Sequence, residues 1–490
     1  MSGDRQRDGV GAARRHWYAR SDRATLVNMS ATLRHLQVVA RHGDRLPIFA
    51  PSQGCGAAEA AEARAWAARA RGGGGGGGAP WGQLTALGAA QARARGAQLR
   101  TRYASFVDRA PRVAAAASNY ARTQISCEEL LSGLLAPSRA EPVAVRVAPP
   151  ADCPLAAFDR GPALYAVQQR VYETLPWYAS EERRLRAVAG VLTRAIPYFR
   201  TSRFMWIKAF DVLTTHAAHG FPLPPLVAHP TIAHTVADHL FWRFTTLLGH
   251  AQPLQLASGD LLAQLAAATA AAAAVQDSAA TGGRHGSSAP VADVSVHCGH
   301  DVTILPLLLA LAETLDQPQR YYGLAQQPTV QAIFSDGGQD QLSSREALLQ
   351  ALAWPGYAAA VCFELHHEAS GGDGAGGDAG RWLLHWRFFD DALQPDVSGG
   401  GAAAAAAAVA APPWHIHWDG GGSGTDPEDD GDVAAALRAA GSHAPRRRAT
   451  QLHGCLSLAG WLQLAADVAG GRLGRPLPAA AAPGAHAAHE

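Results

Sequence analysis

Short apolar runs alternate along most of the chain with longer segments whose apolar residues recur at helical spacing. The runs have the length of buried strands, and the longer segments are rich in Ala, Leu, Gln and Arg, which favour helices. Such alternation is typical of a largely parallel sheet flanked by helices on both faces, so we expect an α/β fold. The predicted strands span 33–40, 112–118, 291–298, 357–367 and 381–390, and the predicted helices span 82–106, 123–135, 204–220 and 300–315.

The middle of the chain, residues 155–275, shows mostly helical periodicity. A long helical stretch between two strand-rich parts is expected to fold as a unit inserted into the sheet domain. We therefore predict a discontinuous α/β core at 33–150 and 286–468, interrupted by an inserted, mainly helical cap domain at 151–285.

Several stretches rich in Gly or Ala lack the apolar patterning that a packed core requires. We predict disordered tails at 1–32 and 469–490, and low-complexity loops at 71–80, 370–380 and 398–445. The last loop contains WHIHWD at 414–419, which would place His415 and His417 on one face of a strand, as in a zinc site. An exposed strand between two unstructured segments is the favoured interpretation.

The composition limits the classes of function. The 490 residues carry a formal net charge of +1, with a hydrophobic fraction of 48% and a charged fraction of 17%, as in ordinary globular proteins. This balance provides no overall attraction to nucleic acid or to an anionic membrane, so any anion site must be local. The alanine runs are too weakly hydrophobic and too interrupted for stable membrane insertion. The oligomeric state is left open.

The N-terminal residues lack the apolar segment of a secretory signal. We therefore expect an intracellular protein, in the cytoplasm or in an organelle such as the mitochondrion. Without a secretory signal and without a CxxC pair, free thiols are expected rather than a disulfide framework or a zinc knuckle. The six cysteines are Cys55, Cys127, Cys153, Cys298, Cys362 and Cys455.

The most informative polar residues follow three of the predicted strands. In open α/β sheets, ligands bind beyond the carboxyl ends of the strands. Two of the three groups also begin helices, whose N-termini favour anions. We expect these residues to meet at one rim of the sheet: Arg41, His42 and Arg45 after the first strand, Arg122 after the second, and His300 and Asp301 after the strand at 291–298.

This set of side chains suits phosphoryl transfer. Three guanidinium groups can bind phosphate oxygens and stabilise the charge of the transition state. One neutral imidazole can attack phosphorus, a second can donate to the phosphate oxygens, and a carboxylic acid can protonate the leaving group. Because the arginines supply the positive charge, we expect neither a metal ion nor another cofactor.

Two segments, RHGDRLP at 41–47 and GHDVTILPLLLAL at 299–311, resemble the signature motifs of the histidine acid phosphatases, branch 2 of the histidine phosphatase superfamily. The resemblance implies that His42 is the nucleophile and Asp301 the proton donor. It implies a phosphate site formed by Arg41, Arg45, Arg122 and His300. It also implies that the helix at 204–220 lines the substrate entrance, where the candidate contacts, for which core packing is an equal alternative, are Trp206, Asp211 and His219.

Within that family, CPL at 153–155 and WPGYAAAVCFELHHE at 354–368 most resemble the lysophosphatidic acid phosphatase type 6 branch, relative to which 316–353 is an insertion. The resemblance implies that the protein hydrolyses a small-molecule phosphate monoester, with lysophosphatidic acid, a lysophospholipid, as the favoured substrate and monoacylglycerol as the product. Two alternatives remain: a phytase or broad-specificity acid phosphatase, and a catalytically inactive scaffold that binds a phosphorylated ligand. The moderate Arg and Lys content of 155–275 and its several Trp and Phe residues argue against a highly charged inositol phosphate as substrate. The presence of both His42 and Asp301 argues against the scaffold.

Overall fold

A computed structural model of the chain describes residues 33–70, 81–110, 112–136, 142–221, 223, 227, 229–280, 291–322, 328–368, 381–391, 430–440 and 447–477. The predicted tail at 1–32, the loops at 71–80 and 370–380 and the motif at 414–419 lie outside the described residues. The predictions made for those segments therefore stay predictions.

The described strands form one mixed sheet of nine strands, in the order β3-β2-β4-β1-β7-β8-β9-β5-β6. The first strand lies inside the sheet, between β4 and β7, and every residue of it except Arg34 is buried. The strands are β1 (Leu33–Arg41), β2 (Val113–Ala117), β3 (Val145–Val147), β4 (Val294–Gly299), β5 (Val330–Phe334), β6 (Gln339–Leu342), β7 (Ala360–Glu368), β8 (Arg381–Phe389) and β9 (Ala449–Ser457).

The prediction of a largely parallel sheet is wrong. Among the described strands, β1–β4, β2–β4 and β2–β3 pair in parallel, whereas β1–β7, β7–β8, β8–β9, β5–β9 and β5–β6 pair antiparallel. The parallel pairs join strands that are separated along the chain by helices. A helix returns the chain to the end of the sheet at which the previous strand began, so the next strand runs in the same direction. By contrast, β7 and β8 pair from Ala360↔Phe389 to Glu368↔Arg381, which is the register of a hairpin.

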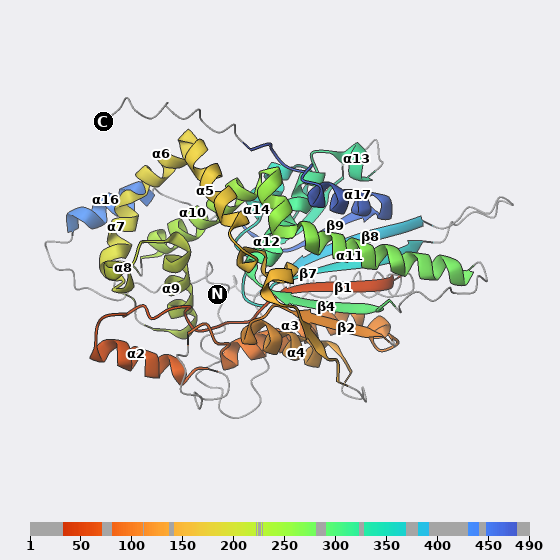
Figure 1. The fold of residues 1–490 in the computed structure, drawn as a ribbon, viewed down its shortest axis with the longest axis horizontal. Helices are drawn as coiled ribbons and strands as arrows, with labels where there is room; N and C mark the ends of the chain where they lie inside the picture. The colour runs from red at the N-terminus through yellow and green to blue at the C-terminus, as the bar shows by residue number, and fades with distance from the viewer. Residues whose placement is uncertain are drawn as a thin grey trace, which may run out of the picture.

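Helices cover both faces of the sheet (Figure 1). On one face, α3 (Ala86–Val107) and α4 (Ala121–Leu134) pack on the apolar residues of β1, β2 and β4. On the other face lie α11 (Ala251–Ala280), α12 (Asp301–Thr314) and α17 (Leu458–Ala469). Gly96 lets α3 lie close to α4, because a Cβ at this position would lie 2.1 Å from the carbonyl oxygen of Leu130.

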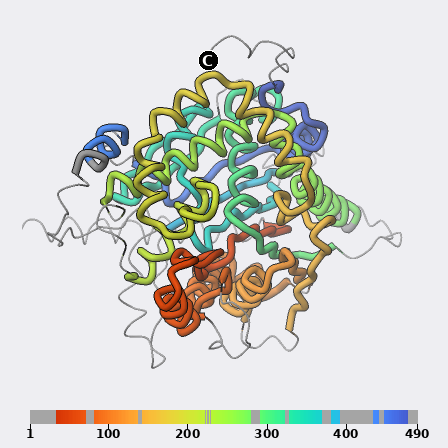
Figure 2. The backbone as a smooth tube through the Cα atoms, turned by 60° about the vertical axis from the view of Figure 1, so that its left-hand side comes forward, coloured from red at the N-terminus to blue at the C-terminus, as the bar shows by residue number. Residues whose placement is uncertain are grey.

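The residues between β3 and β4 form helices and no strand in their described part. Turned so that they come forward, these inserted helices cover one end of the sheet (Figure 2). They begin with two short 3-10 turns at Pro150–Asp152 and Pro154–Asp159 and end with α11. Between these lie α5 (Ala163–Thr174), α6 (Pro176–Arg184), α7 (Arg186–Ala195), α8 (Tyr198–Thr201), α9 (Trp206–His219) and α10 (Pro230–Leu248).

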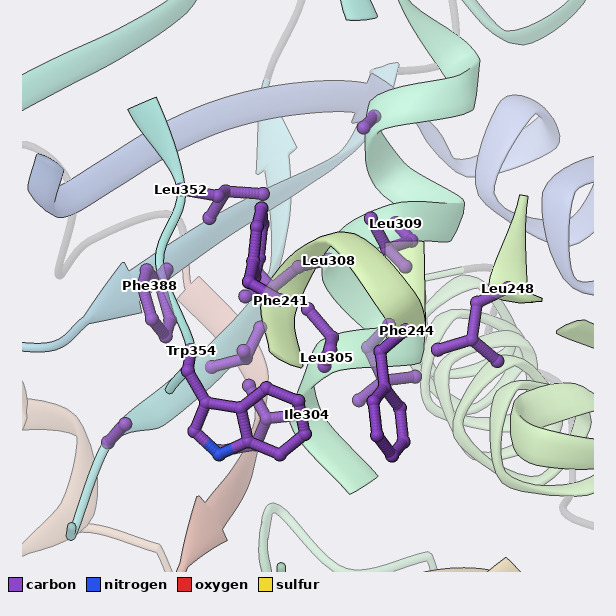
Figure 3. Packing of buried hydrophobic residues seen from close by; sticks show 14 of the residues in the cluster. Phe241, Phe244, Leu248, Ile304, Leu305, Leu308, Leu309, Leu352, Trp354 and Phe388 are labelled. Atoms are coloured by element: carbon purple, nitrogen blue, oxygen red, sulfur yellow. The ribbon is translucent and has the colours of Figure 1, made fainter. Parts of the chain in front are cut away.

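The helix that follows β4 is apolar on all sides because it lies between the sheet and the inserted helices. Figure 3 shows Ile304, Leu305 and Leu308 of α12 packed against Phe241 and Phe244 of α10. Trp354, Leu352 and Phe388 close the same cluster from the sheet side. This packing fixes the start of α12, which carries Asp301, relative to the inserted helices.

Four segments hold structure that the sequence patterns did not indicate. α2 (Ala57–Ala67) follows the first strand, and α16 (Asp430–Ala440) lies inside the predicted loop at 398–445, with Ala436 and Ala440 buried in the core. The predicted C-terminal tail is ordered over 470–477, where Leu473 is buried and Arg475 pairs with His250. The insertion at 316–353 forms α13 (Pro318–Tyr322), β5, β6 and α14 (Arg345–Ala351), and its strands extend the sheet at the edge away from β1.

One described helix, α11, is long and apolar enough to cross a membrane by length and composition, over Ala251–Ser278. Half of that window is buried inside the protein, and Gln37 of β1 donates a hydrogen bond to the carbonyl oxygen of Leu265. A core helix passes the same test, so length and composition do not identify α11 as a membrane span.

Candidate active site

The ends of β1 and β4 bring two candidate motifs side by side. Arg41, the last residue of β1, is in register with Gly299 at the end of β4, and the amide of His42 donates to the carbonyl oxygen of Gly299 at 3.1 Å. Gly299 directly precedes the His–Asp pair. β2 flanks β4 on its other side, and Arg122 occupies the second position of the following helix, α4. The six residues expected at the rim therefore come together at one place.

The imidazole of His42 is buried and oriented by the backbone. Its Nδ1 lies 2.7 Å from the carbonyl oxygen of Gly43, so Nδ1 carries the proton and Nε2 keeps its lone pair. Burial and the positive charges of Arg122 and Arg41 hold the pKa of His42 well below its usual value. The ring is therefore neutral, which is the form that can attack an electrophile.

Gly43 allows the loop after β1 to lie directly against α3. A Cβ at position 43 would lie 1.9 Å from the carbonyl oxygen of Gly88, in the first turn of that helix. The amide of Gly43 donates to Ser126 Oγ of α4 at 3.1 Å, and the amide of Asp44 donates to Gln91 Oε1 of α3 at 2.8 Å. Both helices on this face of the sheet thus hold the loop that carries His42.

Arg45 is held by the inserted helices. Its Nη1 lies 2.6 Å from Oδ1 of Asp211 in α9, and Oδ2 of the same carboxylate accepts the amide of Ile48 at 2.9 Å. Asp211 is one of the candidate substrate contacts, and in this structure it pairs with an arginine of the phosphate motif. The pair ties the loop after β1 to α9.

Arg122 lies close to Arg45 without an acidic partner of its own among the described residues. Its guanidinium stacks over the ring of Tyr120, at 4.1 Å from the ring centre. Burial and the nearby charge of Arg45 lower the pKa of Arg122 to about 10. Buried cations that repel one another favour an anion between them.

All three arginines keep an unused donor. In the described part of the chain, the Nε atoms of Arg41, Arg45 and Arg122 are buried and have no hydrogen-bond partner. Buried guanidinium donors are rarely left unsatisfied in native proteins. Their convergence beside a neutral imidazole therefore indicates a site that is completed by an oxyanion.

Asp301 accepts two side-chain donors on a single oxygen. Its Oδ2 lies 2.8 Å from Arg41 Nη2 and 2.9 Å from Trp354 Nε1. Burial raises the pKa of this carboxyl group, but Arg41 and Trp354 lower it more, so the pKa lies below its usual value. Without a ligand, Asp301 is therefore the ionised partner of Arg41.

His300 lies beside His42, with ring centres 5.4 Å apart, and its Nε2 contacts Ser118 Oγ at 2.9 Å. Burial and the charge of Arg122 lower the pKa of His300 to about 3, so its ring is neutral as well. Both imidazoles can thus serve an oxyanion without adding charge.

The two other candidate substrate contacts lie in different surroundings. His219 Nε2 is 2.6 Å from the buried Oδ2 of Asp44, so this histidine anchors α9 to the loop after β1. Trp206 donates its indole N–H to Glu182 Oε2 at 3.0 Å and packs against His239. The contacts described for Trp206 are with the inserted helices, away from His42, which fits the core-packing alternative.

The sequence analysis missed residues contributed by the segment before β7. Trp354 bonds to Asp301, and the ring of Tyr357 lies against the guanidinium of Arg41, at 4.3 Å from its carbon, and 6.0 Å from the ring of His42. The signal was present as WPGY immediately before an apolar strand, but nothing local indicates that a strand's amino end lies beside the carboxyl end of β1. The antiparallel pairing of β1 with β7 creates that juxtaposition.

The described residues contain no group of three or more His, Cys, Asp or Glu side chains that could hold a metal ion. The cysteines predicted to be free are free within the structure. The arginine donors, the two neutral imidazoles and the carboxyl group of Asp301 form a set that can bind, transfer and release a phosphoryl group.

One family model and several solved structures are similar to this chain. Residues 32–375 match the model of the histidine phosphatase superfamily (branch 2), and no curated protein sequence matches the chain. Among solved structures, the phytase of Klebsiella sp ASR1 is 15% identical with a TM-score of 0.44, covering 92% of this chain and 98% of the phytase. The multiple inositol polyphosphate phosphatase of Bifidobacterium longum, solved with inositol hexasulfate, is 13% identical with a TM-score of 0.42, covering 73% of this chain and 86% of that protein.

The family match spans more than half of the chain and includes both the segment around His42 and the segment around Asp301. The chain therefore belongs to branch 2 of the histidine phosphatase superfamily and is a phosphatase.

Proposed function

We propose that the protein hydrolyses phosphate monoesters through a phosphohistidine at His42, without a metal ion. The observation that carries the proposal is the neutral His42 ring, with Nε2 unprotonated, beside three buried arginines whose Nε donors lack partners in the described structure. An oxyanion at this position would satisfy the arginines and bring phosphorus to the imidazole.

In the first step, Arg41, Arg45, Arg122 and His300 bind the phosphate. The negative charge of the bound phosphate raises the pKa of Asp301, so its carboxylate takes up a proton from solvent. His42 Nε2 then attacks phosphorus, the bond to the ester oxygen breaks, and Asp301 transfers that proton to the ester oxygen as the alcohol leaves. In the second step, water attacks the phosphohistidine while Asp301 takes back a proton, which releases inorganic phosphate and regenerates neutral His42.

For the substrate itself, we propose a molecule with one phosphate and an apolar group, such as lysophosphatidic acid. A Cβ built at Gly82 would lie 3.6 Å from Arg122 Nη1 and 4.0 Å from Cγ2 of Ile48, so this aliphatic side chain, 41% exposed, lies near Arg122. Tyr120, whose ring stacks on Arg122, donates its hydroxyl to Asp159 Oδ2 at 3.1 Å. A carboxylate at this rim disfavours a substrate with several further phosphates.

The test is a phosphate-release panel of lysophosphatidic acid, inositol hexakisphosphate, a phosphosugar and nitrophenyl phosphate, with His42→Ala protein as the contamination control. We expect the highest kcat/KM with lysophosphatidic acid and no change after dialysis against a chelator. Preference for inositol hexakisphosphate would overturn the substrate and favour a phytase. If phosphate is released from none of the substrates, the proposed hydrolase activity is overturned and a phospholigand-binding scaffold is favoured.

A further inference from the structure

The segment Trp354–Ala358 contacts three of the residues proposed to act on phosphate. Trp354 Nε1 donates to Asp301 Oδ2 at 2.9 Å, and the carbonyl oxygen of Pro355 accepts from Arg41 Nη1 at 2.6 Å. The amide of Ala358 donates to the carbonyl oxygen of His42 at 3.1 Å. The acid, one arginine and the nucleophile therefore share one short segment as a support.

Two further hydrogen bonds hold the segment Trp354–Ala358 in place. The amide of Gly356 donates to the buried Asp390 Oδ1 at 2.8 Å, and Arg95 Nε donates to the carbonyl oxygen of Ala358 at 2.9 Å. Ala358 has a φ of 56°, and it is the one non-glycine residue with positive φ in the described chain. Such a conformation persists only where the surroundings enforce it, and it is often found at functional sites.

The side chain of Trp354 is also held in place by its burial in an apolar cluster. Its side chain is 2% exposed and packs beside Ile304 and Phe244 in the cluster below α12 (Figure 3). The indole N–H is the polar atom at the edge of this apolar cluster, and its acceptor is the carboxylate of Asp301. A buried aromatic ring therefore sets the position of a hydrogen-bond donor to the proposed acid.

Arg41 is the other side-chain donor to Asp301 Oδ2, and it is also a proposed phosphate ligand. A phosphate on the free Nε of Arg41 offsets the charge of the guanidinium and weakens its hold on the carboxyl group. Trp354 is the side-chain donor on Oδ2 that the phosphate does not engage, while Oδ1 accepts the amide of Val302 at 2.8 Å. The indole keeps the carboxyl group oriented during the step in which its proton is needed.

We propose that Trp354 is a positioning residue that orients Asp301 for proton transfer to the leaving group. This inference rests on the proposed function. Trp354 touches the acid rather than the reacting atoms, so its loss should act on leaving-group protonation more than on phosphate binding.

Removal of the indole N–H should also shift the pH dependence of phosphoenzyme formation in a defined direction. A donor to the carboxylate form lowers the pKa of Asp301, so its removal raises that pKa and moves the alkaline limb of phosphoenzyme formation to higher pH. The charged and titratable groups that face Asp301 stay in place in the variant: Arg41 of β1, Arg45 of the following loop, Arg122 of α4 and His300 beside it.

The experiment compares Trp354→Phe with Trp461→Phe. Trp461 is also fully buried, packs against Phe363, and has an Nε1 without a partner in the described structure, so its replacement removes an indole N–H that does not bond to Asp301. Single-turnover phosphorylation of His42 is measured with an alkyl phosphate and with nitrophenyl phosphate. We expect Trp354→Phe to slow the alkyl reaction about tenfold or more and the nitrophenyl reaction far less, with little change in KM. Trp461→Phe should change neither rate.

Equal slowing of both substrates by Trp354→Phe, or an unmoved alkaline limb, would overturn the inference. If Trp354→Phe does not fold, 3-benzothienylalanine at position 354 removes the N–H while keeping the ring shape, and the same outcomes apply. Wild-type enzyme that forms no phosphohistidine would overturn the proposed function itself. If Asp301→Asn slows the alkyl reaction more than the nitrophenyl reaction but Trp354→Phe does not, only the role of Trp354 is overturned.

Discussion

Arg41 Nη2 lies 2.8 Å from Asp301 Oδ2, so the arginine before the proposed nucleophile is ion-paired with the proposed acid. The two groups follow neighbouring parallel strands and meet because Arg41 and Gly299 are in register. A phosphate on the free Nε of Arg41 adds negative charge close to this pair. Substrate binding and the protonation of Asp301 are therefore coupled.

The first prediction concerns that coupling. Arg41 holds the pKa of Asp301 below its usual value, whereas a bound dianion offsets the positive charge of Arg41, so the pKa rises and a proton is taken up. We expect proton uptake when sulfate, which does not titrate, binds at about pH 5 to 6. Sulfate affinity should fall as pH rises from the pKa of Asp301 in the free protein to its pKa in the complex, and it should level off above that. Calorimetry in two buffers of different ionisation enthalpy measures the uptake, and Asp301→Asn should abolish it; uptake that persists in this variant would contradict the assignment.

The second prediction is that His42→Ala abolishes turnover and leaves the fold intact. Wild-type enzyme quenched during turnover should contain an acid-labile, base-stable phosphoprotein, and the variant should contain none. His35→Ala is the matched control, because His35 lies on the same strand with its Nδ1 2.9 Å from the carbonyl oxygen of Ala292. Activity that survives in His42→Ala, or is lost equally in His35→Ala, would refute the role of His42.

The third prediction is that Asp301→Asn discriminates between leaving groups. An alkoxide needs protonation in the transition state, worth roughly a hundred- to ten-thousandfold in rate, whereas nitrophenolate needs little help. Phosphorylation of His42 by an alkyl phosphate should therefore slow far more than phosphorylation by nitrophenyl phosphate. Single-turnover measurement isolates this step from later water attack. The same slowing factor for both substrates would exclude Asp301 as the leaving-group acid.

The fourth prediction concerns Asp211, which is buried beside Arg45. Asp211→Ala leaves a buried cation without its partner, which typically costs about 3 to 5 kcal/mol of unfolding free energy. Glu368→Ala removes an exposed pair with Arg381 and should cost less than about 1 kcal/mol. Denaturant unfolding gives both values. Sulfate should stabilise Asp211→Ala more than the wild type because the anion supplies charge to Arg45; equal stabilisation would argue against Arg45 as an oxyanion ligand.

The residues at the rim could be predicted from the sequence because each follows an apolar strand within a few positions. Parallel neighbours end at the same edge of a sheet, so Arg41, His42 and the His–Asp pair at 300–301 could be placed together without knowledge of distant packing. The pairing direction of the later strands could not be predicted in this way. Apolar runs indicate strands, but a buried strand has a similar composition whether its neighbour runs parallel or antiparallel.

The partners of those residues were decided only by the tertiary structure. Trp354 lies 53 positions from Asp301, and His219 lies 175 positions from Asp44. No local pattern joins such pairs, because the contact depends on how β7 pairs with β1 and on how α9 packs over the loop after β1. Local sequence patterns are enough to assign these chemical groups to the strand ends. The packing of distant segments decided which of them are paired, which are neutral and which keep free donors, because burial and neighbouring charge set those properties.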